Sequence, residues 1–308
     1  MRYDAVKWRL NFLYTRHWPM DKTLASKLYL TNLTTAPLVS VCIPTYKGGA
    51  YLAAAIDSVL AQTLVDFQLI VVDDNSPDDT AQIVARYRDP RLIYVRNPSN
   101  LGPEGNWNRC LELATGRYFK LLPHDDLLAP ACLERQAAIL ESDTVQALAL
   151  VFGARNVIGP DGRRLAIRRY GHAGNERLPA QTVGTQCVRR GTNVLGEPGS
   201  VMFRRELAQR VGRFDARYPY VIDLDYWLRL LDHGDAYYCD EELSAFRVSR
   251  EQWSVRLGRQ QAEDFQQCMR HYLARSGRRL GLLDRSVGLL TPALNNWGRR
   301  LFYQLYLR

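Results

Sequence analysis

The stretch LVSVCIPTY (Leu38–Tyr46), followed by GGAYLAAAIDSVLAQT (Gly48–Thr63) and FQLIVVDD (Phe67–Asp74), decides the fold. The first and third segments are short, apolar and rich in β-branched residues, whereas the middle segment is Ala-rich and amphipathic. This order predicts a strand, a helix and a second strand. Because strands without polar alternation are buried on both faces, the pattern indicates parallel strands covered by helices on both sides.

The alternation of strands and helices continues along the chain. It weakens in a polar, glycine-containing stretch at residues 161–180, which we expect to form a loop or hairpin near a binding face. The predicted fold class is therefore α/β, a Rossmann-like, mostly parallel sheet with helices on both faces. Further strands are predicted at residues 91–97, 118–126, 145–159 and 236–248, and helices at 78–89, 105–116, 129–142 and 222–234.

Positive charge is concentrated at the two ends of the chain. The 308 residues carry 41 Lys and Arg against 32 Asp and Glu, a formal charge of +9. Residues 1–36 contribute +4 and residues 269–308 contribute +7, which leaves −2 for residues 37–268. Since a nucleic-acid-binding domain presents a broad basic face, this distribution argues against DNA or RNA as a partner.

Aromatic residues such as Trp8 and Trp297 lie among the charges of both ends. Arg with Trp, Tyr and Leu in a short helix is the composition of an interfacial anchor. Two interpretations stay open: peripheral contact with an anionic membrane, and packing on the domain or on a second subunit of a homo-oligomer. We expect one α/β domain, residues 37–250, with basic helical extensions at 1–36 and 251–308.

The cysteines and the start of the sequence indicate the compartment. The six cysteines are scattered, without a CxxC pair or a His at zinc spacing. Residues 1–18 lack the continuous apolar segment of a secretory signal, and no apolar run is long enough to cross a bilayer. We therefore expect reduced thiols in a cytoplasmic protein, peripheral at the inner face of the membrane if the ends are anchors.

Polar residues follow four predicted strands at the point where each strand ends. Because ligands bind outside the carboxyl ends of parallel strands, we expect these residues to form one site. An aromatic ring, single carboxylates and paired acids suit the base, ribose and cation-bound phosphates of a nucleotide. Neither GxGxxG nor GxxxxGK[ST] occurs, which argues against the usual dinucleotide and ATPase loops. The residues are Pro44-Thr45-Tyr46, Asp73-Asp74, Asn97 with Asn100, and His124-Asp125-Asp126.

Four blocks of sequence, in order, resemble family 2 glycosyltransferases of the GT-A fold. The resemblance covers about residues 38–250 and implies a nucleotide-sugar-binding half, 37–130, and an acceptor-binding half, 131–250. The blocks are VSVCIPTYKGGAYLAAAIDSVLAQT (39–63), DFQLIVVDDNSPDDT (66–80), NPSNLGPEGNWNRCLELATGRYFKLLPHDD (97–126) and DLDYWLRL (223–230).

The resemblance implies which residues bind the donor. Thr45 and Tyr46, with Pro44 beside them, match the nucleotide contacts after the first strand. Asp74 matches the acid that binds the uracil or ribose, and Asn100 is a further candidate contact at the third strand end.

His124-Asp125-Asp126 occupies the position of the family's DxD motif. By this resemblance Asp126 holds Mg²⁺ or Mn²⁺ and Asp125 lies near the donor sugar or ribose. His124 replaces the first Asp of the motif, and we assign it no metal role because a hard cation prefers oxygen ligands.

Asp223 matches the catalytic base of the family's ED block, although the preceding Glu is replaced by Ile222. Asp225, two residues further, is the alternative assignment. Where the family often has a His after an Arg, this chain has Arg247 followed by Ser249, so Arg247 or Arg250 is expected to meet the diphosphate instead.

The implied function is metal-dependent, inverting transfer of a sugar from a UDP- or dTDP-sugar to a glycan or lipid-linked oligosaccharide in polysaccharide biosynthesis. A single base suffices for inversion. Two alternatives remain: a nucleotidyltransferase, and a non-catalytic nucleotide-sugar-binding scaffold. For Glu197 in the turn GEPGS (196–200), a hydrogen bond to a sugar hydroxyl and a plain turn are equally open.

Overall fold

The structure is a computed structural model that describes residues 36–171, 174–249 and 260–277 and a few positions beyond them: 281, 288, 291–292, 294–295 and 297–298. The chain divides into two units, residues 1–36 and 37–308, and every described strand and helix belongs to the second unit. The predicted N-terminal extension and most of the chain after Gly277 lie outside the described residues.

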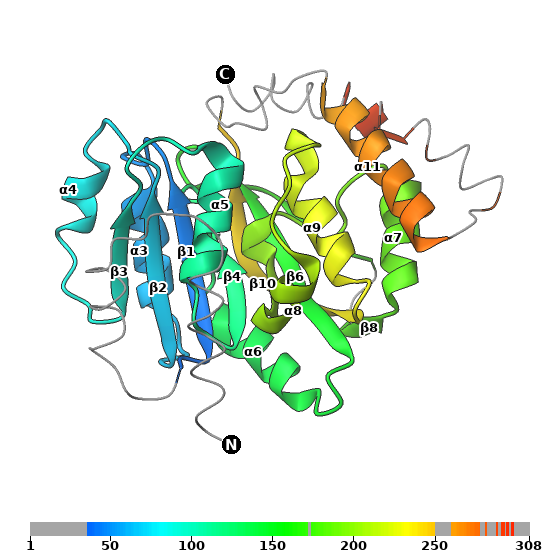
Figure 1. Cartoon of the computed structure of the whole chain (residues 1–308), viewed down its shortest axis with the longest axis horizontal. Helices are drawn as coiled ribbons and strands as arrows, with labels where there is room; N and C mark the ends of the chain where they lie inside the picture. Colours follow the sequence, from blue (N-terminus) through cyan, green and yellow to red (C-terminus); the bar gives the residue numbers. More distant parts are fainter. Residues whose placement is uncertain are drawn as a thin grey trace. The chain divides into compact units, whose positions relative to one another are not determined.

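Within the described ranges, a ten-stranded sheet runs through the domain in the order β3-β2-β1-β4-β9-β6-β10-β5 (Figure 1). β7 pairs with β6, and β8 pairs with β10. The strands are β1 (Val39–Thr45), β2 (Phe67–Asp73), β3 (Leu92–Arg96), β4 (Tyr118–Leu121), β5 (Leu127–Leu128), β6 (Leu148–Ile158), β7 (Arg164–Arg168), β8 (Glu176–Leu178), β9 (Val201–Arg204) and β10 (Asp235–Arg247).

The α/β fold class is confirmed, and the parallel arrangement holds for the first half of the sheet. β1 pairs in parallel with β2 and β4, and β2 with β3, as the uniformly apolar strands predict. The second half is mixed, because β9 runs antiparallel to both β4 and β6. β9 begins beside the carboxyl end of β4 and is entered from a turn rather than from a crossover helix, so it runs in the opposite direction.

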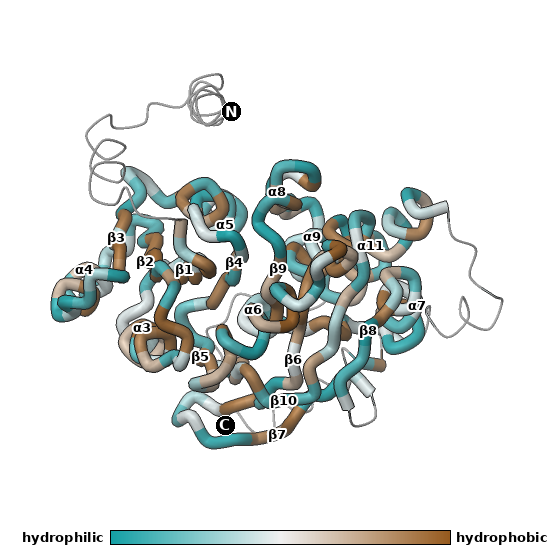
Figure 2. Tube along the Cα trace, turned by 90° about the horizontal axis from the view of Figure 1, so that it is seen from below, coloured by the Kyte–Doolittle hydropathy of each residue, from teal (hydrophilic) through white to brown (hydrophobic). Residues whose placement is uncertain are grey.

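Helices cover both faces of the sheet, as predicted, and alternate strand residues separate two apolar cores. Val41 and Ile43 of β1 join the core under α3 and α6, whereas Cys42 between them joins the core under α5, α8 and α9. Figure 2 shows α3 and α5 on opposite sides of the sheet. The helices are α3 (Leu52–Leu60), α4 (Thr80–Val84), α5 (Gly102–Leu113), α6 (Cys132–Ser142), α7 (Ala180–Arg190), α8 (Arg205–Val211), α9 (Ile222–Leu230) and α11 (Gln260–Ser276), with 3-10 turns η1 (Pro198–Ser200) and η2 (Pro219–Val221).

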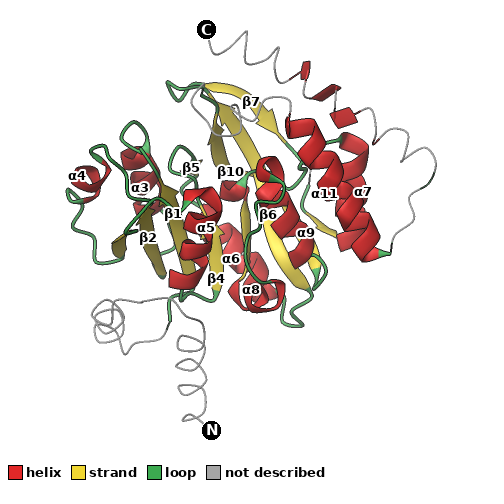
Figure 3. Ribbon diagram, turned by 45° about the horizontal axis from the view of Figure 1, so that its top comes forward, coloured by secondary structure: helices red, strands yellow, loops and turns green. Residues whose placement is uncertain are grey.

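Helix α11 belongs to the larger core although it lies in the segment after residue 250. Its residues Phe265 and Tyr272 are buried in the same cluster as Trp227 of α9. The carboxylate of Asp264 accepts a hydrogen bond from the backbone N–H of Tyr220, 2.9 Å away, in the turn that leads into α9. Figures 1 and 3 show α7 and α11 side by side. The position of α9 therefore depends on residues far along the chain.

Arg204, the last residue of β9, fastens this strand to its surroundings. Its guanidinium is buried and donates to the carbonyl oxygens of Leu148 at 3.0 Å and Leu140 at 2.9 Å, and to the Asp143 carboxylate at 3.0 Å. One side chain thus joins β9 to the end of α6 and the start of β6.

We predict that Arg204→Ala lowers the free energy of unfolding by about 3–5 kcal/mol, because it leaves the buried Asp143 carboxylate without its cation and three carbonyl groups without this donor. Urea unfolding followed by circular dichroism measures this loss. The control is Arg117→Ala, which removes an exposed ion pair with Glu141 at 2.8 Å and is expected to cost about 1 kcal/mol or less. Equal losses in the two variants would contradict the role given to Arg204.

Candidate active site

The loop after β1 is packed against the loop after β2 at the carboxyl ends of both strands. The backbone N–H of Lys47 donates to Ser76 Oγ at 3.0 Å, and that of Gly48 donates to Thr80 Oγ1 at 3.1 Å. Gly48 is required here, since a Cβ at this position would lie 2.3 Å from Thr45 Oγ1. Two strand ends that the sequence places in one site are thereby held together.

The nucleotide contacts predicted at the carboxyl end of β1 differ in their exposure to solvent. Pro44 and Thr45 are buried, and Thr45 Oγ1 has no hydrogen-bond partner among the described residues. Tyr46 is 42% exposed, and Lys47 Nζ lies 5.5 Å from the centre of its ring. An exposed ring beside a buried hydroxyl with unused bonding capacity is suited to a flat, polar ligand.

Asp74 lies at the end of β2 and organises the loop that begins α5. Its Oδ1 accepts hydrogen bonds from Asn97 Nδ2 at 2.9 Å and from the N–H of Leu101 at 2.8 Å, and its Oδ2 accepts from the N–H of Gly102 at 2.9 Å. A carboxylate at the start of a helix is favourable because the first N–H groups lack partners within the helix. The exposed side chain of Asn100 donates to the backbone oxygen of Asp74 at 3.2 Å.

Asp126, the candidate metal ligand, is buried and bound to Arg247. Its Oδ1 accepts the backbone N–H of Arg247 at 2.9 Å, and the Arg247 side chain donates through Nε to the carbonyl oxygen of Asp125 at 2.9 Å. Arg247 Nη1 also donates to the carbonyl oxygens of Gly159 and Pro160 at 2.9 and 3.0 Å. Arg247 therefore holds the turn that carries Asp125 and Asp126 in place. Its contact with a diphosphate stays a prediction. Arg250 lies outside the described residues.

The charges around Asp126 favour a cation. Burial raises the pKa of its carboxyl well above the usual value, and the charges of Asp125 and Glu197 raise it further. In the described part of the chain, no group of three or more His, Cys, Asp and Glu side chains is arranged around a metal position. Mg²⁺ and Mn²⁺ bound with a nucleotide take only one or two protein carboxylates and complete their shell with phosphate oxygens, so Asp126 with Asp125 fits such an ion.

Asp223 lies in the first turn of α9 and is partly buried. Asn193 Nδ2 donates to its Oδ2 at 3.0 Å. Burial raises the pKa of the Asp223 carboxyl to about 7 and the charge of Glu197 adds to this effect, while hydrogen bonds from the backbone N–H of Leu224 and from Asn193 oppose it. A carboxylate with a pKa close to neutral is suited to accept a proton during a reaction.

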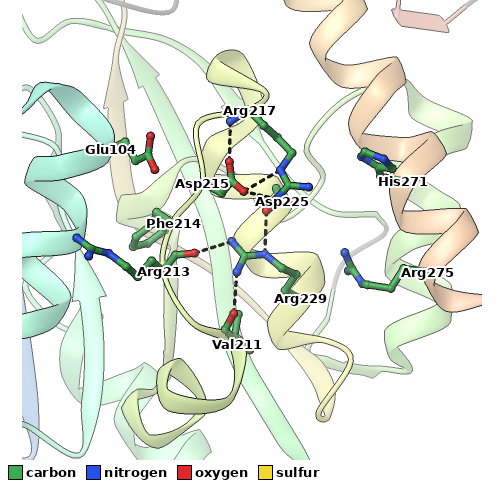
Figure 4. Close-up of a pocket in the computed structure, with 10 residues that line it drawn as sticks. All are labelled: Glu104, Val211, Arg213, Phe214, Asp215, Arg217, Asp225, Arg229, His271 and Arg275. Carbon is green, nitrogen blue, oxygen red and sulfur yellow. Dashed lines mark hydrogen bonds and ion pairs between the residues drawn. The ribbon is translucent and has the colours of Figure 1, made fainter. Parts of the chain in front are cut away.

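The geometry separates Asp223 from Asp225, the alternative assignment. Two residues along a helix correspond to a rotation of about 200°, so the two side chains leave α9 on opposite sides. Asp225 accepts a hydrogen bond from Arg229 Nε at 2.8 Å and lines a cavity of about 560 Å³ with Arg217 and His271 (Figure 4). Asp225 thus belongs to an ion pair on the other side of α9 from Asp223, which favours Asp223 as the reactive carboxylate.

Glu197 forms an ion pair with Arg155 of β6, whose Nε donates to Glu197 Oε2. Burial raises the pKa of Glu197, but the charges of Arg155 and Arg168 outweigh it and hold the pKa below the usual value. Gly196 before it has φ +98°, and a Cβ there would lie 2.8 Å from Arg155 Cζ, so only glycine fits. The turn that carries Glu197 therefore places a fixed anion close enough to Asp223 to act on its pKa.

Asn193 and Arg155 were not among the residues selected from the sequence. The pattern TNVLG (192–196), an Asn three residues before a glycine, is typical of a side chain that caps a turn. Arg155 is the one charged residue of a mostly apolar strand, and a buried charge in such a strand needs a partner. Both signals indicate a contact, but neither identifies Asp223 or Glu197 as the partner.

We predict opposite effects of two substitutions in α9 on thermal stability. Because the pKa of Asp223 is raised to about 7 in the folded protein, the folded state binds an extra proton between about pH 4 and 7 and loses stability as the pH rises through this window. Asp223→Asn removes this loss, so its melting temperature should exceed that of the wild type at pH 8 and approach it at pH 5. Asp225→Asn breaks the pair with Arg229 and should melt below the wild type at pH 8. Differential scanning calorimetry at both pH values measures these differences, and a lower melting temperature of Asp223→Asn at pH 8 would contradict the assignment.

Comparison with known proteins identifies relatives of this chain. It is 36% identical over 219 residues to an uncharacterised protein of Mycobacterium tuberculosis, covering 68% of this chain and 67% of the relative. It is 29% identical to an uncharacterised glycosyltransferase of Rickettsia typhi, covering 70% of this chain and 65% of the relative. It is also 31% identical to the succinoglycan biosynthesis protein ExoO of Rhizobium meliloti, covering 58% and 51%. The chain therefore spans about two thirds or less of the length of these relatives.

A solved structure shares the fold. The structure of residues 1–349 of S. aureus TarS in complex with UDP-GlcNAc superposes with a TM-score of 0.63 at 20% sequence identity, covering 88% of this chain and 76% of that chain. The family model described as glycosyl transferase family 2 matches residues 40–212, which is more than half of the chain. Because this match covers more than half of the chain, the chain belongs to glycosyltransferase family 2.

Proposed function

We propose that this protein transfers a sugar from a UDP- or dTDP-sugar to a glycan or lipid-linked oligosaccharide, with inversion at the anomeric carbon. The observation that carries the proposal is Asp223, a partly buried carboxylate with a pKa of about 7. Glu197 raises the pKa of both Asp223 and Asp126, so the two candidate groups share a common neighbour. We favour UDP over dTDP because S. aureus TarS, which shares the fold, was solved in complex with UDP-GlcNAc.

The arrangement supports a single displacement. An acceptor hydroxyl attacks the anomeric carbon, its proton passes to Asp223, and the bond to the diphosphate oxygen breaks with the electron pair leaving on the nucleoside diphosphate. Asp223 takes the proton, and the neighbouring carboxylate of Glu197 is engaged by Arg155 and forms no covalent intermediate, so the configuration inverts. Mg²⁺ or Mn²⁺, held by Asp126, would stabilise the charge of the departing diphosphate as a Lewis acid.

The donor side is assigned to the loops after β1, β2 and β3. Tyr46 presents its ring to the base, Thr45 offers a hydroxyl without a partner in the described residues, and Pro44 packs beside them. Asp74 and Asn100 fix the loop that begins α5 and contact the uracil or ribose. The role in polysaccharide biosynthesis is supported by the similarity to ExoO.

We predict that UDP with Mn²⁺ raises the melting temperature of the wild type, since a ligand that binds only the folded state stabilises it. Asp126→Ala should lose the part of this rise in melting temperature that depends on Mn²⁺. Asp223→Asn should retain the full shift yet lose about 10²–10⁴-fold in release of UDP from a UDP-sugar with an acceptor. Thermal shift assays with UDP, dTDP, GDP and CMP, each with and without Mn²⁺, and a coupled UDP-release assay measure both effects.

The rival functions give different results in the same assays. A scaffold would bind UDP and show no turnover that Asp223→Asn could remove. A nucleotidyltransferase would respond to a nucleoside triphosphate rather than to the diphosphate. Either result would overturn the proposed transfer.

We include peripheral contact of the C-terminal segment with the inner face of an anionic membrane in the proposal. Two of its few described residues, Leu294 and Trp297, are 65% and 68% exposed. Exposed Leu and Trp among arginines are the composition of an interfacial anchor. In the part of the chain that the structure describes, no helix has both the length and the apolar character needed to span a bilayer.

We predict that the double substitution Leu294→Ser with Trp297→Ser weakens sedimentation with vesicles that contain anionic lipid, because it removes the apolar side chains that enter the interface. Val65→Ser, at a site that is 75% exposed elsewhere in the domain, serves as the matched control and should leave binding unchanged. Unchanged vesicle binding together with a change in oligomeric mass on gel filtration would instead support contact with a second subunit.

A further inference from the structure

Asn193 lies between α7 and η1, and both ends of its side-chain amide are occupied. Its Oδ1 accepts the backbone N–H groups of Leu195 and Gly196, each at 3.1 Å. Its Nδ2 donates to the carbonyl oxygen of Gly196 at 2.9 Å and to Asp223 Oδ2 at 3.0 Å. One side chain thus links the turn that carries Glu197 to the carboxylate on α9.

The orientation of this amide is determined by its partners. Two backbone N–H groups can only be accepted by an oxygen, so Oδ1 must face Leu195 and Gly196, and the NH₂ group must face Asp223. Asn193 can therefore only donate to Asp223. When Asp223 is neutral, its proton cannot lie between Oδ2 and Asn193, and it must be carried on a side of the carboxyl group that faces away from Asn193.

We propose that Asn193 is a positioning residue that selects the ionised form and the orientation of Asp223, so that the carboxylate is ready to accept the proton of the acceptor hydroxyl. The inference rests on the proposed function of Asp223 as the base. The ability of Asp223 to act as a base then depends on a residue 30 positions away in the chain, and this residue belongs to the turn before η1 rather than to α9.

The backbone N–H of Leu224 donates to Asp223 Oδ1 at 2.7 Å and also favours the ionised form, so Asn193 acts on the other oxygen, Oδ2. The charged and titratable side chains around Asp223 do not replace the hydrogen bond from Asn193. Glu197 opposes ionisation of Asp223, and its charge is compensated by Arg155 and Arg168 from β6 and β7. Two thiols also face Asp223 from the helices packed near it. These thiols are Cys187 of α7 and Cys268 of α11. Burial raises the pKa of both thiols and the charge of Asp223 raises it further, so both stay neutral near pH 7. Asn193 is thus the side-chain donor that the described residues provide to Asp223.

The experiment compares pH profiles of kcat for the wild type, Asn193→Asp and Asn193→Ser. Asn193→Asp keeps an oxygen for the N–H groups of Leu195 and Gly196 but faces Asp223 with a second carboxylate. Asn193→Ser keeps a hydroxyl oxygen that can accept a hydrogen bond from the turn, but the Ser side chain is too short to reach Asp223. We expect Asn193→Asp to move the acid limb of the kcat profile up by about one pH unit or more, which is a loss of about tenfold in kcat at pH 6. Asn193→Ser should move the limb in the same direction by a smaller amount. KM for the donor should not change, and the rate should recover at about pH 9.

The matched control is Asn108→Asp. Asn108 is buried and, like Asn193, uses both ends of its amide: it donates to the carbonyl oxygen of Phe214 at 3.0 Å and accepts the Phe214 N–H at 2.8 Å. This substitution should lower the melting temperature without moving the acid limb. A general loss of packing would therefore affect both asparagines, whereas the proposed role affects the pH profile of Asn193 variants alone.

A second measurement makes the result independent of turnover. In protein labelled with ¹³C-aspartate, the carboxyl signal that is absent from Asp223→Asn reports the titration of Asp223, and Asn193→Ser should raise its midpoint. An unchanged midpoint and an unchanged acid limb would overturn the proposal. A wild type without transfer but with a midpoint that rises in Asn193→Ser would overturn the proposed function and leave the positioning contact established.

Discussion

The link between Asp126 and Arg247 is the interaction on which the rest of the site depends. Asp126 ends the turn after β4, and Arg247 is the last residue of β10, so this contact ties the acidic turn to the mixed half of the sheet. The guanidinium of Arg247 also holds the turn after β6 through Gly159 and lies 4.5 Å from the centre of the Tyr51 ring. Three loops that come from different parts of the chain therefore have one fixed arrangement around the acidic turn.

The same arrangement explains how acids can be gathered in a site that lacks a glycine-rich phosphate loop. Isolated carboxylates in a partly buried place repel one another and resist ionisation. Here each has a different partner: Asp74 has the N–H groups that begin α5, Glu197 has Arg155, and Asp126 has the backbone of Arg247. The carboxylates whose pKa stays raised, Asp126 and Asp223, are the two that would interact with a cation and with a proton.

The parts of the fold that could be predicted from the sequence are those set by local patterns. The apolar runs at Leu38–Tyr46 and Phe67–Asp74 predicted β1 and β2 because burial on both faces leaves no polar alternation. The antiparallel direction of β9 could not be predicted, because it depends on where the preceding turn meets β4. Asp223 could be selected as a candidate through its sequence block, whereas Asn193 could not, because its partner lies 30 residues away and no local spacing encodes that distance.

The docking of α11 has a consequence for the order in which the protein matures during synthesis. The core that supports α9 is completed by Phe265 and Tyr272, and Asp264 fixes the turn before α9 through Tyr220. A chain still emerging from the ribosome can pair β1, β2 and β4 early, since all three precede residue 122. The helix that bears Asp223 cannot complete its packing until α11 has been released from the exit tunnel. A nascent chain is therefore expected to pass through a state in which the strands of the first half are paired before the position of Asp223 is fixed.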